Sequence, residues 1–147
     1  MKHTLLFLLL ICASSLQITV AGNRPKLTDD ELMTLVQKQT FRYFWDFAHP
    51  DSGLARERSN DRLEVATIGG SGFGVMAIIV GVERGFITRE QGAERLLKMV
   101  EFLNKADSYH GIWAHWMDGA TGKTIPFSRK DDGADLVESA LMFEGLL

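Results

Sequence analysis

The run GFGVMAIIVGVERG, from Gly72 to Gly85, is the stretch of this sequence that decides the fold. Its side chains are apolar almost all round, as in a helix that is buried on both sides. Its glycines permit a neighbouring backbone to approach closely, at a cost of about 1 kcal/mol each in helix propensity. Gly85 itself fits the C-terminal cap of such a helix. The run therefore predicts a helix that other elements cover on both sides.

Capping boxes on either side of this run predict two more helices. The first box is TDDE, Thr28 to Glu31, and the second is TREQ, Thr88 to Gln91. The turn residues of HPDSG, from His49 to Gly53, end the first helix. The apolar face expected for the first helix is Leu32, Leu35, Val36, Tyr43, Phe44 and Phe47. The face expected for the second is Ala93, Leu96, Leu97, Val100 and Leu103.

The segment from Ile112 to Phe127 breaks the helical pattern, and its turn signals predict one small β-hairpin. A fourth helix is expected to start near Asp131 and to run to the end of the chain. The apolar periodicity of LVESALMFEGLL is still running at Leu147, so we expect a piece of a longer chain. The prediction is an all-α fold of about four helices with a small hairpin.

The first residues, Met1 to Ala21, have the pattern of a signal peptide. Lys2 is followed by a short apolar run, Leu5 to Ile11, which is far below the ~20 residues that span a bilayer. We therefore expect export, with residues 22–147 as the mature segment. Acylation of Cys12 as a lipoprotein is disfavoured because a bulky isoleucine precedes it. Cleavage would remove this single cysteine, which excludes a disulfide or a cysteine metal site in the mature segment.

The charge balance argues against a nucleic-acid partner. The chain has 16 basic and 19 acidic residues, a formal net charge of −3, and no basic block. The glycines from 69 to 74 match a nucleotide-binding loop only in part, because the third glycine is missing and no strand-like run precedes them. Tight helix packing is the favoured interpretation of these glycines. No GxSxG nucleophile motif is present.

Clustered carboxylates provide the candidate chemistry. Asp135 and Glu138 are three residues apart on the expected fourth helix, which places their Cβ atoms about 5–6 Å apart on one face. Glycosidases use two carboxyl groups, about 5 Å apart for retention and about 6.5–9.5 Å apart for inversion. The alternative is that acidic residues in a first turn merely stabilise the helix dipole. The spacing alone leaves both interpretations open.

The position of each acid along this helix predicts different roles. A helix N-terminus stabilises a charged carboxylate, whereas a general acid must hold a proton. Asp131 and Asp132, nearest the expected start, are therefore better caps than acids. Glu138, one turn deeper and flanked by apolar residues, is the better candidate for the acid. Asp135 is better as an ionised partner or as an acceptor for a sugar hydroxyl.

Aromatic residues before the acids are candidate sugar contacts. Trp113 and Trp116 could stack on sugar rings, and His115 could hydrogen-bond a hydroxyl. Alternation along one strand would place the two tryptophans on opposite faces, so both are unlikely to serve one sugar. Packing in the core is the more common role of such tryptophans. The histidines show no metal-ligand spacing, and we expect no metal site.

Loop arginines are further candidates. Arg56 and Arg58 could line a cleft, although arginines in loops are mostly solvated partners of surface acids.

Four blocks of sequence resemble the bacterial glycoamylase-like proteins, which include the endo-β-1,2-glucanase family of glycoside hydrolases. The blocks are HPDSGLARERS (49–59), TIGGSGFGVMAIIVGVERGFITR (67–89), HGIWAHWMDGATGKTIPFS (110–128) and DDGADLVES (131–139). The resemblance implies an (α/α)6 toroid, of which this chain is a partial arc truncated from the larger barrel. It also implies inverting hydrolysis of β-1,2-glucan without a metal or organic cofactor.

The same resemblance implies site residues within the matching blocks. Asp135 and Glu138 lie in the DDGxDLVE block, whose acids line the cleft. The sugar contacts that it makes plausible are Trp113, His115, Trp116, Arg58 and Asp132. The second catalytic carboxylate is expected elsewhere, in chain beyond Leu147.

The prediction for the parent protein is an exported glycoside hydrolase that binds an oligo- or polysaccharide and is monomeric at full length. One alternative is a polysaccharide lyase on a helical toroid, with His115 or Tyr109 as base. Another is a non-catalytic glycan-binding protein, in which the aromatics matter and Glu138 does not. We expect the 147-residue chain alone to be inactive and poorly soluble, because an open arc exposes apolar faces.

Overall fold

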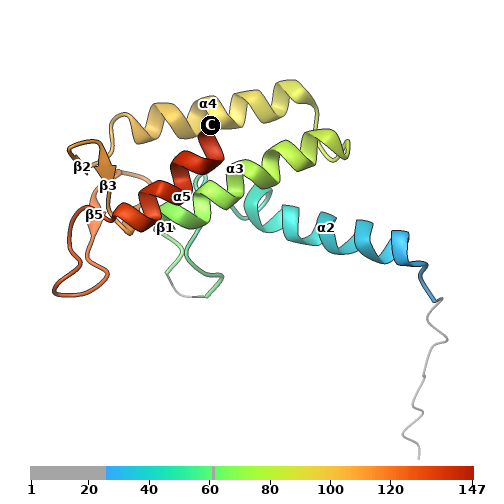
Figure 1. Cartoon of the computed structure of the whole chain (residues 1–147), viewed down its shortest axis with the longest axis horizontal. Coiled ribbons are helices and arrows are strands. Elements are labelled where there is room, and N and C mark those ends of the chain that lie inside the picture. Colours follow the sequence, from blue (N-terminus) through green and yellow to red (C-terminus); the bar gives the residue numbers. More distant parts are fainter. Residues whose placement is uncertain (1–25, 61) are drawn as a thin grey trace, which may run out of the picture.

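The computed structural model describes residues 26–60 and 62–147, so the predicted signal peptide, 1–21, lies outside the described residues. Within them, four helices and five short strands form the fold (Figure 1). The helices are α2 (Asp29–Trp45), α3 (Ile68–Glu83), α4 (Arg89–Leu103) and α5 (Leu136–Leu146). The strands are β1 (Val65–Thr67), β2 (Ser108–Tyr109), β3 (Ile112–Trp113), β4 (Trp116–Asp118) and β5 (Thr124–Ile125). The predicted helical class and number of helices are confirmed.

Local sequence signals set the ends of three helices. The Thr28 Oγ1 accepts the backbone N–H of Glu31, and the Glu31 carboxylate accepts the N–H of Thr28, at 3.3 and 2.8 Å. Thr88 and Gln91 repeat this arrangement at the start of α4. Gly85 has a φ of 67° directly after the last turn of α3, a conformation that glycine adopts without strain. Both predicted capping boxes and the glycine cap are confirmed.

The strands differ from the single hairpin predicted over residues 112–127. β4 pairs antiparallel with β5, but it also pairs with β1, which precedes α3 in the chain. β2 and β3 form a separate hairpin whose turn residues, His110 and Gly111, both have positive φ. The pairing of β1 with β4 joins segments about 50 residues apart, which a local turn signal does not reveal.

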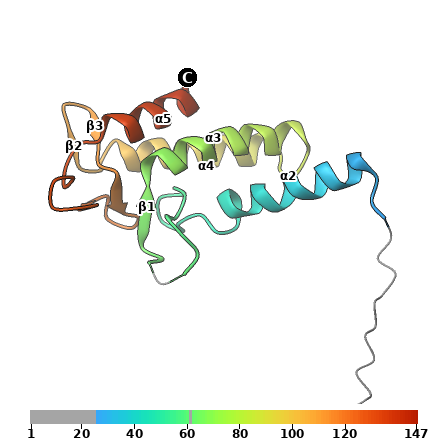
Figure 2. The ribbon, with the colours of Figure 1, turned by 60° about the horizontal axis from the view of Figure 1, so that its bottom comes forward.

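Helix α3 is the centre of the packing. It begins at Ile68, four residues before the expected start, and it follows directly on strand β1. The expectation that no strand precedes these glycines is therefore wrong. Figure 2 shows α5 beside the N-terminal half of α3 and α2 beside its C-terminal half. A Cβ at Gly72 would overlap the Leu141 carbonyl of α5, and one at Gly81 would overlap the Phe41 ring of α2.

The burial of α3 differs from the prediction of a helix covered on both sides. Ile68, Val75 and Ile78 are buried, whereas Phe73 and Ile79 are 54% and 55% exposed. Among the described residues, α5, α2 and α4 all contact α3, and they leave Phe73, Met76, Ile79 and Val80 exposed.

The predicted apolar faces of the other helices are also only partly right. In α2, Phe41 is buried, while Leu32, Leu35 and Val36 are exposed. In α4 the buried residues are Gly92, Met99 and Leu103, while Leu97 and Val100 are exposed. The reason is that α4 turns its Met99 side, not its Leu97 side, toward the core shared with Leu54 and Ile78. No helix of residues 26–60 and 62–147 is long and apolar enough to cross a membrane.

Candidate active site

The acidic block before α5 folds differently from the predicted helix start. α5 begins at Leu136, and Asp135 is its N-cap, since the Asp135 Oδ1 accepts the N–H groups of Val137 and Glu138 at 2.9 and 3.1 Å. Asp131 instead closes a turn with Ser128 through backbone hydrogen bonds. The expectation that Asp131 and Asp132 cap the helix is therefore wrong, because this turn and the Ala114–Ala134 bridge hold the chain extended up to Asp135.

Glu138 consequently lies in the first turn of α5 and not one turn deeper, as predicted. Its side chain points across to α3, where its Oε2 accepts the N–H of Gly69 at 2.9 Å. The N-cap residue of α3, Thr67, makes no side-chain capping bond, so Glu138 supplies an acceptor to a helix end that otherwise lacks one. The positive end of a helix attracts a carboxylate, which fixes this side chain between the two helices. The Glu138 side chain is 17% exposed.

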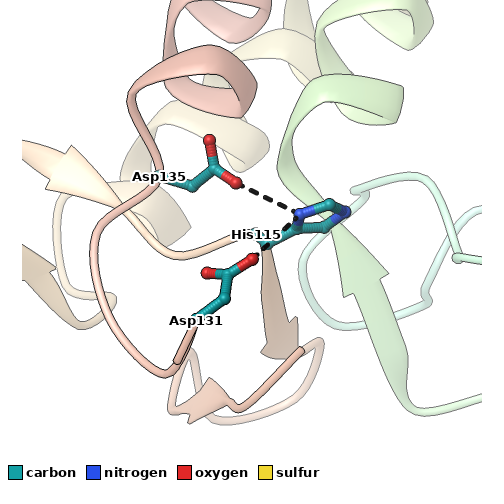
Figure 3. A group of neighbouring side chains, drawn as sticks. All are labelled: His115, Asp131 and Asp135. Atoms are coloured by element: carbon teal, nitrogen blue, oxygen red, sulfur yellow. Dashed lines mark hydrogen bonds and ion pairs between the residues drawn. The ribbon is translucent and has the colours of Figure 1, made fainter. Parts of the chain in front are cut away.

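His115 connects Glu138 with the aspartates. Its Nδ1 lies 3.1 Å from the Asp135 Oδ2 and 3.7 Å from the Asp131 Oδ2, and Figure 3 shows both aspartates directed at this edge of the ring. Its Nε2 lies 3.9 Å from the Glu138 Oε1. The Phe127 ring stacks on the imidazole, with centroids 4.1 Å apart and an interplanar angle of 19°. The ring therefore has a carboxyl group at each nitrogen and an aromatic face.

A pocket of about 370 Å³ opens beside this group. Its charged and polar lining comes from His115 and Glu138 on one side and from the loop after α2 on the other. The remaining side chains that line it include Tyr43, Phe44, Arg56, Glu57, Phe73 and Leu141. A pocket of this size with a mixed polar and aromatic wall suits a small polar ligand such as a sugar unit.

Hydrogen bonds fix the loop side of the pocket. The Arg56 guanidinium donates to the carbonyls of Leu63 and Phe47 at 2.7 and 3.0 Å. The Tyr43 hydroxyl donates to the Arg56 carbonyl at 2.7 Å. Burial raises the pKa of Tyr43, and the nearby charge of Glu57 raises it further. Tyr43 is therefore a neutral donor over the physiological pH range, and it cannot readily act as a base.

The structure brings together only some of the predicted site residues. His115 and Glu138 line the pocket, and Asp135 contacts the Nδ1 of His115 outside the pocket lining. Arg58 is exposed and pairs with Glu57, and Asp132 is exposed in the loop before α5. Neither of these two lines the pocket.

The two tryptophans also lie outside the pocket lining. Trp113, in β3, packs on Phe143 with its Nε1 donating to the Leu103 carbonyl at 3.2 Å. Trp116, in β4, is only 6% exposed. They lie on strands of two different sheets, so the expected alternation along one strand is wrong. Their contacts are those of packing residues.

Sequence reasoning missed most of the pocket wall. Tyr43 and Phe44 belong to the expected apolar face of the first helix, Phe73 belongs to the apolar run, and no sequence signal indicates Glu57. The loop residues suggest Arg56 and Arg58 alike and the resemblance adds only Arg58, whereas only Arg56 lines the pocket. The available signal is the position of Arg56 close to the turn residues that follow α2, and Arg58 shares this position, so the signal does not distinguish the two arginines.

One group of described residues could hold a metal ion by its geometry. The donor atoms of His115, Asp131 and Asp135 lie within 4.8 Å of one another, although their sequence spacing gave no such indication. Both carboxylates approach the same ring nitrogen, and an imidazole N–H at that nitrogen satisfies them without a metal. Hydrogen bonding to the imidazole therefore explains the arrangement of these three residues without a metal ion.

Comparison with known proteins gives relatives for most of the described chain. No protein-family profile matches. The chain is 52% identical, over 130 residues, to an exo-β-1,2-glucooligosaccharide sophorohydrolase acting at the non-reducing end, from Parabacteroides distasonis. This match covers 88% of the chain and 18% of that relative.

Solved structures extend the comparison to the fold. A glucoamylase-like protein from Bacteroides uniformis superposes with a TM-score of 0.81 at 81% identity, over 82% of this chain and 30% of that one. An endo-β-1,2-glucanase from Chitinophaga pinensis, solved with sophorotriose and glucose, superposes with a TM-score of 0.79 at 54% identity, over 82% of this chain and 31% of that one. The chain thus spans less than a third of the length of these relatives.

The predicted resemblance and the predicted arc of a larger helical fold are both confirmed over the matched part. Over the part of their length that it covers, the chain is related to the β-1,2-glucan hydrolases and glucoamylase-like proteins.

Proposed function

We propose that the complete protein is a glycoside hydrolase that cleaves β-1,2-linked glucan. The observation that carries this proposal is the placement of Glu138 at the pocket, beside His115, in a chain related to β-1,2-glucan hydrolases. The pocket combines aromatic surface for a sugar ring with carboxylate and guanidinium groups for its hydroxyls.

Glu138 is the carboxyl that we assign to the reacting sugar. Because it lies in the first turn of α5, depth in the helix no longer supports the role of acid, and the assignment rests on its place at the pocket beside His115. Its Oε2 is occupied by the N–H of Gly69, which leaves Oε1 on the side of His115. In an inverting enzyme, one carboxyl protonates the leaving oxygen and a second one activates water from the opposite face. Glu138 would protonate the leaving oxygen or orient the sugar, and the second carboxylate would come from elsewhere in the complete protein.

Asp135 supports this site instead of reacting. Its Oδ1 accepts two backbone N–H groups of α5, and its Oδ2 faces the His115 Nδ1. Both oxygens are therefore engaged, which fits the expected role of an ionised partner.

We further propose export through residues 1–21 as a signal peptide and a monomeric full-length protein.

Product analysis tests the proposal. The complete protein encoded by this gene would be incubated with linear β-1,2-glucan, starch and a polyuronate, beside Glu138→Gln and Glu144→Gln variants. Glu144 is exposed on the same helix, so its variant is the matched control. We expect short β-1,2-gluco-oligosaccharides from the wild type and from Glu144→Gln, and a loss of about 10²–10⁴-fold in Glu138→Gln.

Other outcomes would replace the proposal. An unsaturated product from the polyuronate, detected by its ultraviolet absorbance, would indicate a lyase. Binding of glucan without any product, unchanged in Glu138→Gln, would indicate a non-catalytic glycan-binding protein.

A further inference from the structure

We infer that His115 is a positioning residue for Glu138. The imidazole carries its hydrogen on Nδ1, and the lone pair on Nε2 faces the Glu138 carboxyl. This lone pair orients the carboxyl so that the transferable proton sits on Oε1. The inference rests on the proposed function for its catalytic consequence. It assigns His115 a different role from the sugar contact expected from the sequence.

The surroundings of Nδ1 define the tautomer. The Asp135 Oδ2 lies 3.1 Å from it and the Asp131 Oδ2 lies 3.7 Å from it. An ionised carboxylate can only accept hydrogen bonds, so the ring nitrogen between the two must donate. The Asp135 carboxylate cannot turn away, because its Oδ1 is held by the N–H groups of Val137 and Glu138. Nδ1 therefore bears the hydrogen.

The ring itself is held in place. Phe127 stacks on one of its faces, and Trp116 approaches it edge-on with centroids 5.8 Å apart. The backbone carbonyl of His115 accepts the N–H of Ile68, the first residue of α3, at 3.2 Å. The imidazole is thus fixed relative to the helix whose second residue binds Glu138.

The opposite ring nitrogen then faces Glu138 with a lone pair. The Nε2–Oε1 separation of 3.9 Å is longer than a hydrogen bond, and closing it requires a movement of the Glu138 carboxyl or of the imidazole. A neutral imidazole with hydrogen on Nδ1 can only accept at Nε2, so it favours the carboxyl hydrogen on Oε1 over Oε2. On transfer, this proton goes from Oε1 to the leaving oxygen, and the hydrogen bond to Nε2 is lost.

Two substitutions test the two ring nitrogens separately. In His115→Asn, the side-chain amide lies near the Nδ1 position and keeps a donor for Asp135. In His115→Gln, the amide reaches the Nε2 position and keeps a polar group facing Glu138. In the complete protein we expect His115→Asn to lower kcat by about 10²-fold with KM nearly unchanged, the cost of a misplaced catalytic group. We expect His115→Gln to recover part of this loss. His110→Asn, at an exposed hairpin turn with positive φ, is the control.

The kinetic outcomes are decisive in both directions. A rise in KM with kcat unchanged would overturn the inference and make His115 a sugar contact. Equal kcat losses in His115→Asn and His115→Gln, accompanied by equal falls in the unfolding midpoint, would also overturn it, since this pattern is structural.

The tautomer can be measured without any activity, by the ¹⁵N chemical shifts of the imidazole in the complete protein. We expect the Nδ1–H form in the wild type and a shift toward Nε2–H in Asp135→Asn, in which the amide keeps the helix cap but disturbs the acceptor. An Nε2–H form in the wild type would overturn the assignment. If no glucan is hydrolysed, the proposed function fails, while the tautomer result still decides the geometry.

Discussion

The two sides of α3 differ more in the structure than in the sequence. Val75 and Ile78 are 2% and 1% exposed, whereas Met76 and Ile79, their immediate neighbours in the chain, are 51% and 55% exposed. Both sides are apolar, so composition does not distinguish them. The neighbouring elements do: α5 covers α3 at Gly69 and Gly72, whereas Met76 and Ile79, four and seven residues beyond Gly72 on the same face, are left exposed. In this helix, therefore, hydrophobicity alone does not mark the packed face.

Alanine at two adjacent positions tests this comparison most strongly. Ile78→Ala should lower the free energy of unfolding of the complete protein by about 2–5 kcal/mol, because it leaves a cavity in the core. Ile79→Ala should cost less than about 1 kcal/mol, because that side chain is half exposed. Urea denaturation measures both. Equal losses would show that the exposed side of α3 is covered in the complete protein.

Adding one methyl group at the contact of Gly72 with α5 should have the next largest effect. Gly72→Ala would force α5 away from α3, because the new Cβ meets backbone atoms of Leu141 that cannot move independently. We expect a loss of about 1–3 kcal/mol in thermal or urea unfolding. Activity should fall as well, since α5 carries Glu138. Gly133→Ala, where a Cβ meets nothing within 4 Å, should stay within about 0.5 kcal/mol of wild type.

The cap of α5 has a smaller role in stability than the helix contact. Asp135→Ala removes the acceptor for two N–H groups and should cost about 0.5–2 kcal/mol in urea unfolding. Asp135→Asn preserves the cap and should cost only a few tenths of a kcal/mol. If asparagine were as destabilising as alanine, the contact with His115 would matter more for stability than the cap does.

The smallest effect is expected in the β4–β5 turn, which begins at Asp118. The Thr121 hydroxyl and the N–H groups of Thr121 and Ala120 donate to Asp118 and hold its pKa below the ordinary value. Because the folded pKa is lowered, this stabilisation is present above pH ~4 and is lost as the pH falls further. Solvent screening keeps it to about 0.5 kcal/mol or less. Asp118→Asn should therefore flatten the acid side of the stability profile only slightly, measured by urea unfolding from pH 3 to 6.

The sequence predicted what depends on neighbouring residues. The capping boxes of Thr28 and Thr88 and the cap at Gly85 are complete within a few residues, and all three are confirmed. The start of α5 was misplaced because three aspartates before it are equally good caps by type. The Ser128–Asp131 turn and the bridge between Ala114 and Ala134 decide among them, and neither is a local helix signal.

The candidate site shows the same division. The motif and the family resemblance predicted Glu138, Asp135 and His115, and the structure brings these three together. They did not predict the bond from Gly69 to Glu138, because it joins residues 69 positions apart. Nor did they identify Arg56 over Arg58, since only tertiary contacts with Phe47 and Leu63 turn one of these arginines inward.

The bond between Glu138 and Gly69 also has a consequence for biosynthesis. At a synthesis rate of about 5–20 residues per second, the 69 positions that separate these residues take roughly 3–14 s to translate. During this interval the nascent α3 lacks both its terminal acceptor and the helix that packs on its glycines. Non-local contacts of this kind form late, so we expect the strongly apolar α3 segment to depend on a chaperone until α5 packs on it.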